Sequence, residues 1–153
     1  METAMRAIAD RSLGPAGTAG KSLADWGYTD VGLDDVWQKC GSYGPQKYTF
    51  HDADGNPVVD LSKFPNMRAM TDLAHSLNLT AGWYGNNCRC HDHCSSVECF
   101  AGDVNATLAF GFDSIKLDGC GLEEDVALWN ELFNHSIRIL RQKDVKKNGM
   151  MIE

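Results

Sequence analysis

The stretch that decides the fold is Phe112-Asp113-Ser114-Ile115-Lys116-Leu117-Asp118, which Gly119-Cys120 follows directly. Side chains point alternately to the two faces of a strand, so Ser114, Lys116 and Asp118 share one face and the apolar residues between them share the other. The pattern predicts a strand that packs its apolar face on helices and carries a lysine and an aspartate toward its carboxyl end.

Lys116 and Asp118 are two positions apart on that polar face, which is close enough for each charge to influence the other. An ammonium group favours the ionised form of a nearby carboxyl, and this keeps Asp118 available as a nucleophile. A simple ion pair at the end of a strand accounts for the same spacing. Both interpretations remain open on this stretch alone.

Strands and helices alternate along the whole chain. Predicted strands begin near residues 29, 80, 112 and 149, and Asp54-Gly55 marks a hairpin turn in the long polar segment after the first strand. Predicted helices cover Glu2–Arg11, Thr18–Trp26, a segment from Asn66 to about Leu77, Ser95–Gly111 with a capping box at Ser95-Ser96-Val97-Glu98, and Leu122–Lys143. Strand–helix–strand alternation predicts parallel strands joined by right-handed crossovers.

An open doubly wound sheet and a (β/α)8 barrel both fit this alternation. Two observations favour the barrel: polar residues cluster at the carboxyl ends of successive predicted strands, and no glycine-rich phosphate loop follows any strand. A complete barrel takes about 250 residues. We therefore predict an α/β fold in which residues 1–153 are one incomplete domain, a partial (β/α)8 TIM barrel.

Composition narrows the function classes. The chain has 153 residues, of which 43% are hydrophobic and 23% are charged, and its formal net charge is −7. An acidic chain without a basic face argues against a nucleic-acid partner. No apolar run approaches the roughly 20 residues that span a bilayer, so no membrane span is expected.

A second polar cluster, Asp34-Asp35, ends the first predicted strand, and Trp37 follows it closely. Carboxylates accept hydrogen bonds from hydroxyl groups and an indole stacks on a sugar ring, so this combination suits sugar recognition. A turn or helix-capping aspartate is the structural alternative. Tyr84 ends the next predicted strand, where it would lie at the rim of the same site.

Cysteine and histidine crowd into one loop, Cys88 to Cys99. Disulfides are the favoured interpretation for Cys88, Cys90, Cys94, Cys99 and Cys120, because the loop lacks the pair of Cys-x2-Cys knuckles that is typical of zinc sites. Zinc binding by this loop is the weaker alternative. The remaining histidines, His51, His75 and His135, have no partner visible in the sequence, and we expect structural or surface roles for them.

Four motifs in order resemble the melibiase-type α-galactosidases, a family of retaining glycoside hydrolases that includes α-N-acetylgalactosaminidases. The matching stretches are Gly27–Trp37, Asp54–Met67, Leu73–Tyr84 and Phe110–Cys120. The resemblance covers nearly the whole chain and implies the front half of a (β/α)8 catalytic domain, about strands 2–5 with their helices. Val36 stands where the family has a cysteine, which implies that the disulfide anchored there is absent or rearranged.

The resemblance also implies a mechanism and a set of site residues. Asp118 matches the nucleophile that forms a covalent galactosyl-enzyme, and Asp34, Asp35, Tyr84 and Lys116 match residues that hold the sugar. Trp37 and Cys120 complete the expected substrate-binding set, and Cys120 matches a cysteine that closes a pocket disulfide, for which the family spacing best suits Cys90 and leaves Cys88 and Cys94 open. A retaining mechanism needs two carboxyls, and the resemblance places the acid/base after Glu153.

The activity that the resemblance implies is hydrolysis of terminal α-D-galactosyl residues without a metal or other cofactor, and the 153 residues alone are expected to be inactive. The alternatives are an α-N-acetylgalactosaminidase or related α-glycosidase, and a sugar-binding homologue without catalysis. The expected partner is an α-galactoside oligosaccharide or glycoconjugate, and a homodimer is allowed for the full-length protein. Cysteine pairing and three Asn-x-Ser/Thr sequons favour a secreted or lysosomal/vacuolar protein, although no signal opens the chain.

Overall fold

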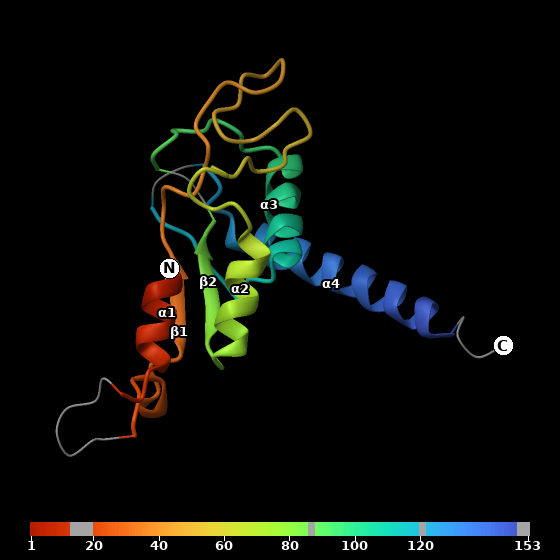
Figure 1. Cartoon of the computed structure of the whole chain (residues 1–153). Helices are drawn as coiled ribbons and strands as arrows, with labels where there is room; N and C mark the ends of the chain where they lie inside the picture. Colours follow the sequence, from red (N-terminus) through yellow and green to blue (C-terminus); the bar gives the residue numbers. More distant parts are fainter. Residues whose placement is uncertain (13–19, 86–87, 120–121, 150–153) are drawn as a thin grey trace.

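A computed structural model describes residues 1–12, 20–85, 88–119 and 122–149, and side chains up to residue 142 (Figure 1). Its elements are α1 (Glu2–Ala9), a 3-10 helix η1 (Ala24–Trp26), β1 (Asp30–Leu33), α2 (Met67–Ser76), β2 (Thr80–Tyr84), α3 (Val97–Phe110), β3 (Ser114–Lys116) and α4 (Val126–Gly149). None of the helices in the described part of the chain combines the length and the apolar character needed to cross a bilayer.

The three strands form one parallel sheet in the order β1-β2-β3. The register pairs Gly32 with Gly82 and Gly82 with Ser114, so these residues lie in one row across the sheet. Helix α2 connects β1 to β2 and helix α3 connects β2 to β3, which is the predicted strand–helix–strand order. The chain is therefore an α/β fragment with a small parallel sheet.

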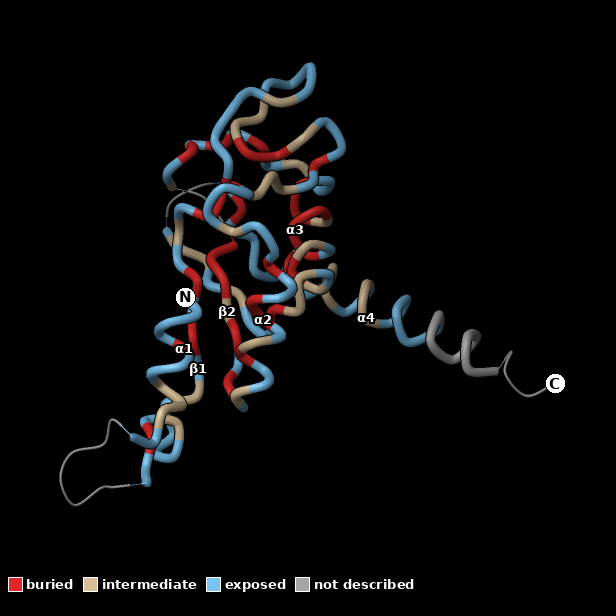
Figure 2. Tube along the Cα trace, in the orientation of Figure 1, coloured by how far each residue is buried: buried red, intermediate tan, exposed pale blue. Residues whose placement is uncertain are grey.

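The two faces of the sheet differ sharply in burial. Val31, Leu33, Ala81 and Trp83 belong to a buried core that includes residues of α1 and α2, and Figure 2 shows buried stretches in β1 and β2. The opposite face is open around the Gly32–Gly82–Ser114 row, where a hollow of about 170 Å³ lies. The apolar side chains of alternate strand residues explain why the helices cover only one face.

A second, smaller core joins α3, β3 and α4. Phe100, Val104 and Trp129 are buried there, and Ile115 and Leu117 pack against them. The alternation predicted for the deciding stretch is thereby confirmed, because Ser114 and Lys116 are exposed while Ile115 faces this core. Beyond these contacts α4 extends away from the rest of the chain (Figure 1).

The predicted ends of the helices are confirmed in part. Asn66 caps α2 by accepting a hydrogen bond from the Ala69 N–H at 2.9 Å, and Gly111 ends α3 in the left-handed conformation with φ of 78°. The predicted capping box at Ser95 is wrong, because α3 begins one residue later with Ser96 as its cap and without a capping bond from the Ser96 side chain.

The helix predicted over Thr18–Trp26 is wrong where the structure describes it. Only the turn η1 forms, because Ser22 and Asp25 hydrogen-bond each other reciprocally and Gly27, with φ of 93°, ends the turn at once. The strand predicted from Gly149 is not seen at Gly149 itself, which is the last residue of α4, and residues 150–153 lie outside the described part.

The hairpin turn at Asp54-Gly55 is confirmed. The Asp52 carboxylate accepts hydrogen bonds from the Asp54 and Asn56 N–H groups at 2.9 Å each, and Gly55 has φ of 80°. The flanking segments pair through isolated bridges, among them His51 with Pro57, and do not form continuous strands.

Candidate active site

Polar side chains meet where the three parallel strands end. Asp34 and Asp35 follow β1, Tyr84 is the last residue of β2, and Lys116 and Asp118 come at the end of β3 and just beyond it. Tyr84 is paired with Lys116 in the sheet register. Because parallel strands bring their carboxyl ends to one edge, residues that are 84 positions apart in the sequence gather there (118 − 34 = 84).

Lys116 is the centre of this group. Its Nζ lies 3.0 Å from Asp34 Oδ2 and 3.5 Å from Asp118 Oδ2, and it stands 5.1 Å from the centre of the Tyr84 ring. The predicted pairing of Lys116 with Asp118 is confirmed as a contact, and Asp34 is a second anionic partner that the strand spacing alone did not reveal. One cation thus joins two carboxylates from opposite edges of the sheet.

Hydrogen bonds and charges fix the ionisation of these groups. The backbone N–H of Asp35, and then Lys116, lower the pKa of Asp34, while Asp34 raises the pKa of Lys116. Burial, and then the negative charge of Asp118, Asp35 and Asp34, raise the pKa of Tyr84 to about 12. At neutral pH the site therefore holds an ionised Asp34, a charged Lys116 and a neutral phenol.

The backbone turns at Val36, as the paired aspartates require. Val36 has φ of 84°, and its N–H donates to Asp35 Oδ1 at 2.8 Å. The other oxygen of Asp35 accepts a hydrogen bond from the Arg89 N–H at 3.1 Å, which ties the end of β1 to the loop after β2. Asp34 and Asp35 can both face one region only because the strand ends here.

The expected role of Trp37 in stacking on a sugar is corrected by its burial. Its side chain is fully buried, so neither face of the indole is open to a ligand. The ring stacks on Trp83 with centroids 4.4 Å apart, and its Nε1–H donates to the Tyr84 carbonyl oxygen at 2.9 Å. Trp37 therefore supports the end of β2 from inside the core.

The disulfides exclude the preferred partner and one of the two alternatives that the resemblance gave for Cys120, and they leave the alternative Cys88 open. Cys90 is bonded to Cys40, with Cα atoms 5.2 Å apart, so the expected bridge from Cys90 to Cys120 is wrong. Cys94 is bonded to Cys99, with Cα atoms 6.3 Å apart. Sequence reasoning had left Cys40 out of the pairing set, although it lies four positions after Val36, the site of the missing family cysteine. Cys120 lies outside the described residues.

A buried polar group that the sequence did not predict lies behind the same strand ends. We call it the His51 cluster: His51, Asp92, Asp103 and Glu123, all of which are buried. His51 Nδ1 lies 2.8 Å from Asp92 Oδ2, and His51 Nε2 lies 3.1 Å from Asp103 Oδ2. His51 thus has the structural role that was expected for it, and its partners, which the sequence did not show, come from a loop and a helix that only the tertiary fold brings together.

His75 also has a partner, Asp113, at 2.8 Å. This pair is exposed and lies at the amino end of β3, away from the strand ends that carry the candidate site. His75 therefore has the surface role that the sequence suggested.

The fold and the site define a class of protein. A parallel sheet with helices on one face, and with carboxylates, a lysine and a tyrosine at its carboxyl edge, is the arrangement of α/β enzymes that bind small ligands at the ends of parallel strands. The exposed polar groups are carboxylate acceptors beside an ammonium donor. They suit a ligand that is rich in hydroxyl groups.

Comparison with known proteins finds relatives that are named probable α-galactosidases. No family model matches the chain. The chain is 32% identical to a probable α-galactosidase of Dictyostelium discoideum over 101 residues, which are 64% of this chain and 24% of that protein. It is 27% identical to probable α-galactosidase B of Talaromyces emersonii over 119 residues, which are 75% of this chain and 24% of that protein.

Solved structures of α-galactosidases are similar to this chain in fold. The chain matches α-galactosidase of Saccharomyces cerevisiae with raffinose at a TM-score of 0.60 and 23% identity, over 88% of this chain and 29% of that one. It matches α-galactosidase I of Mortierella vinacea at a TM-score of 0.58 and 24% identity, over 88% of this chain and 33% of that one. The predicted resemblance to the α-galactosidase family is confirmed, and the chain spans about a quarter of the length of its curated relatives.

Proposed function

We propose that this chain is part of the catalytic domain of a retaining α-galactosidase, an incomplete (β/α)8 barrel with about strands 2–5, and that β1, β2 and β3 are strands 2, 3 and 4 of that barrel. The observation that carries the proposal is the Asp34–Lys116–Asp118 group at the strand ends, with Lys116 Nζ 3.0 Å and 3.5 Å from the two carboxylates. The open sheet face around Gly32 and Gly82 fits the inside of such a barrel.

Asp118 is the proposed nucleophile. Its carboxylate attacks the anomeric carbon of the galactosyl group, a new carbon–oxygen bond forms, and the bond to the leaving oxygen breaks. The Lys116 ammonium, 3.5 Å from Asp118 Oδ2, attracts the carboxylate and helps to position it. The Gly119 N–H donates to Asp118 Oδ1 at 2.8 Å and orients the group. Water then hydrolyses the galactosyl-enzyme and releases galactose with its configuration retained.

The second carboxyl of the mechanism must deliver a proton to the leaving oxygen. Asp34 is unsuited to this task, because the Asp35 N–H and Lys116 lower its pKa and keep it ionised. Asp34 is instead a hydrogen-bond acceptor for sugar hydroxyls. We place the acid/base later in the protein than Glu153, and we therefore expect no turnover from the 153 residues alone.

The remaining groups would hold the sugar or support the residues that hold it. Asp35 accepts hydrogen bonds from hydroxyls, and Lys116 donates to ring or hydroxyl oxygens. Tyr84, whose pKa is raised to about 12, stays neutral, and its side chain is as buried as that of Trp37. Its hydroxyl lies 2.5 Å from Cys88 Sγ, so Tyr84 would support Lys116 through its ring instead of binding the sugar. The Trp37 indole keeps Tyr84 in place through its bond to the Tyr84 carbonyl. Cys120 remains a candidate for the pocket wall.

The proposed substrate class is an α-galactoside oligosaccharide or glycoconjugate, since the yeast α-galactosidase that the chain resembles was solved with raffinose. A secreted or lysosomal/vacuolar location is proposed, which the two disulfides of the described residues support. The proposal includes no nucleic-acid partner and no cofactor. It allows the full-length protein to form a homodimer.

The test is a nucleophile substitution in the full-length protein. We expect Asp118→Asn to lower hydrolysis of a nitrophenyl α-galactoside by about three orders of magnitude or more, because the amide is not a nucleophile. The exposed Asp54→Asn should leave turnover unchanged, since Asp54 belongs to the hairpin turn, where its N–H donates to Asp52, and not to the Asp34–Lys116–Asp118 group. Retained activity in Asp118→Asn refutes the assignment.

Two further measurements separate the alternatives. A mechanism-based galactosyl label should modify Asp118, as peptide mass spectrometry can show. A protein that binds galactosides but hydrolyses none would be a lectin-like homologue, and one that prefers a nitrophenyl α-N-acetylgalactosaminide would be the related glycosidase.

A further inference from the structure

The His51 cluster joins the three loops that follow the three strands. His51 lies in the segment after β1, Asp92 lies in the loop after β2 and Asp103 in α3, and Glu123 lies between β3 and α4. The relative exposure of these residues is 0% for His51 and Asp103, 8% for Asp92 and 3% for Glu123. Burial of one base and three acids away from water is costly unless the charges are compensated.

Asp92 is fully occupied as an acceptor. Its oxygens receive the N–H groups of Phe50 at 3.1 Å and Cys94 at 3.1 Å, as well as the His51 ring nitrogen Nδ1 at 2.8 Å. A fixed carboxylate on Nδ1 keeps the proton on that nitrogen when a cation replaces the proton on Nε2, the nitrogen that faces Asp103 Oδ2 at 3.1 Å. This is the arrangement by which carboxylates orient histidines that bind metals.

Two carboxyl oxygens of the cluster lack such compensation. Asp103 Oδ1 and Glu123 Oε1 are buried, and no donor group of the described residues reaches either one. One donor atom each from His51, Asp103 and Glu123 lies within 4.8 Å of the other two. Two neighbouring buried carboxyls repel each other if both are ionised, so something positive must lie between them, either a proton or a cation.

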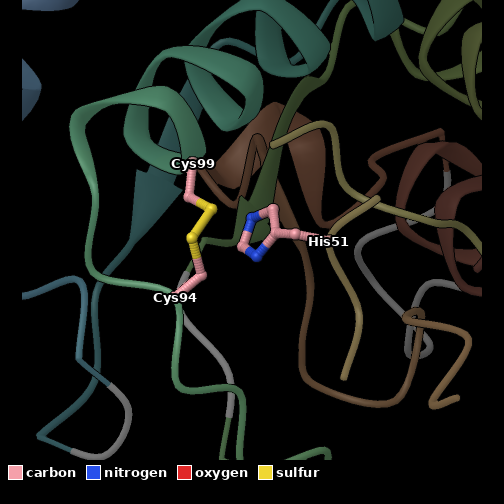
Figure 3. A group of neighbouring side chains, drawn as sticks. All are labelled: His51, Cys94 and Cys99. Atoms are coloured by element: carbon pink, nitrogen blue, oxygen red, sulfur yellow. A yellow bond between two sulfur atoms is a disulfide. The ribbon is translucent and has the colours of Figure 1, made fainter. Parts of the chain in front are cut away.

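The Cys94–Cys99 disulfide narrows the choice of ligands. Figure 3 shows its sulfur atoms beside the His51 ring, and the three residues form a second group of donor atoms within 4.8 Å. Because the two sulfurs are bonded to each other, neither is a thiolate that could bind a metal. The ligands left to His51 are the carboxylates of Asp103 and Glu123.

We propose that His51 Nε2, Asp103 and Glu123 bind one divalent cation of the zinc class, with Asp92 as the carboxylate that orients His51. One imidazole and two carboxylates suit Zn²⁺ better than Ca²⁺ or Mg²⁺, which favour all-oxygen sites. The cation would bond to the two oxygens that have no donor. It is a structural site, because all of its ligands are buried and it joins the loops that also carry Asp35 and Asp118.

The first test measures metal on the unsubstituted chain, purified with its disulfides intact. After removal of metal with EDTA and addition of excess Zn²⁺, the chain should retain one equivalent of Zn²⁺ through dialysis against metal-free buffer, and Ca²⁺ or Mg²⁺ should not displace it. Co²⁺ in place of Zn²⁺ should give visible absorption bands that Zn²⁺ abolishes. A folded chain that retains no Zn²⁺ and gives no Co²⁺ bands overturns the proposal and leaves a shared proton between Asp103 and Glu123.

The second test uses a pair of neighbouring acids. Glu123→Gln keeps the size of the side chain and should weaken Zn²⁺ binding by about 100-fold or more, whereas the exposed Glu124→Gln should bind like the unsubstituted chain. Asp92→Asn should weaken binding by about 10- to 100-fold, because the carboxylate that orients the His51 ring through Nδ1 is lost. Unchanged affinity in a natively folded Glu123→Gln contradicts the proposal, and so does loss of zinc in His93→Gln, which would point to a surface site.

Discussion

The contact between α3 and the hairpin turn predicts how Gly102→Ala changes the free energy of unfolding, and the sign of that change depends on packing. Gly102 lies in α3 opposite the turn, and a Cβ placed on it would contact the Gly55 carbonyl oxygen and lie 2.7 Å from the Gly55 carbonyl carbon and 3.1 Å from Asn56 Cα. The turn cannot retreat easily, because His51 in the same hairpin is bonded to Asp103, the residue next to Gly102. Gly102→Ala must therefore strain one of these contacts.

Two effects compete in Gly102→Ala. Alanine favours a helix interior over glycine by about 1 kcal/mol. Overpacking against a well-packed neighbour costs about 1–3 kcal/mol, and here the neighbour is backbone, which places the cost at the upper end. We expect a net loss of about 2 kcal/mol in the free energy of unfolding. With a urea m-value of about 1.5 kcal/mol/M, the unfolding midpoint should fall by about 1 M.

The assay is urea unfolding of the chain followed by circular dichroism. Ala109→Gly is the matched control, because it reverses the same exchange at an exposed position of the same helix and should cost only about 1 kcal/mol. If Gly102→Ala is as stable as the unsubstituted chain or more stable, helix propensity outweighs packing and the close contact with the turn is refuted.

Three further predictions concern the supports of the site. Trp37→Phe leaves the Tyr84 carbonyl without its donor and should lower the free energy of unfolding by about 2 kcal/mol; an unchanged urea midpoint contradicts this. Removal of both cysteines of the Cys40–Cys90 bridge should lower the free energy of unfolding by about 4 kcal/mol, against about 2 kcal/mol for Cys94–Cys99, because a bridge that spans 50 residues restricts the unfolded chain more than one that spans 5. Equal losses in calorimetry contradict this explanation. Although burial lowers the pKa of His51, Asp103 and Asp92 raise it to about 9, so its contribution to stability is present below pH 6.5 and is lost as the pH rises through 9. In EDTA the urea midpoint should therefore fall as the pH rises from 6.5 to 9.5. A midpoint that does not change with pH, or the same fall in His51→Gln, excludes a contribution of the protonated His51 to stability.

Local sequence determined the elements whose signals lie within a few residues. The run Thr80–Tyr84 is a strand with the predicted bounds, Asn66 caps α2, and Gly111 ends α3, because a capping amide and a left-handed glycine act on their immediate neighbours. Alternation of side chains along 114–118 predicted which residues of β3 face the core. The order of the strands followed from the alternation of strands and helices.

Tertiary structure alone decided the partners of these residues. The sequence predicted that the Trp37 indole stacks on a sugar, but the folded chain buries it in the core. A large apolar ring is more stable when it is buried against Trp83 than when it is exposed to water. Cys40 was invisible as a partner of Cys90 because the closeness of two cysteines 50 positions apart is a property of the folded backbone. The same holds for His51, whose two carboxylates come from segments more than 40 positions away. A sequence displays the chemical groups, whereas the distances between them, which decide charge, pairing and metal affinity, exist only after the chain has folded.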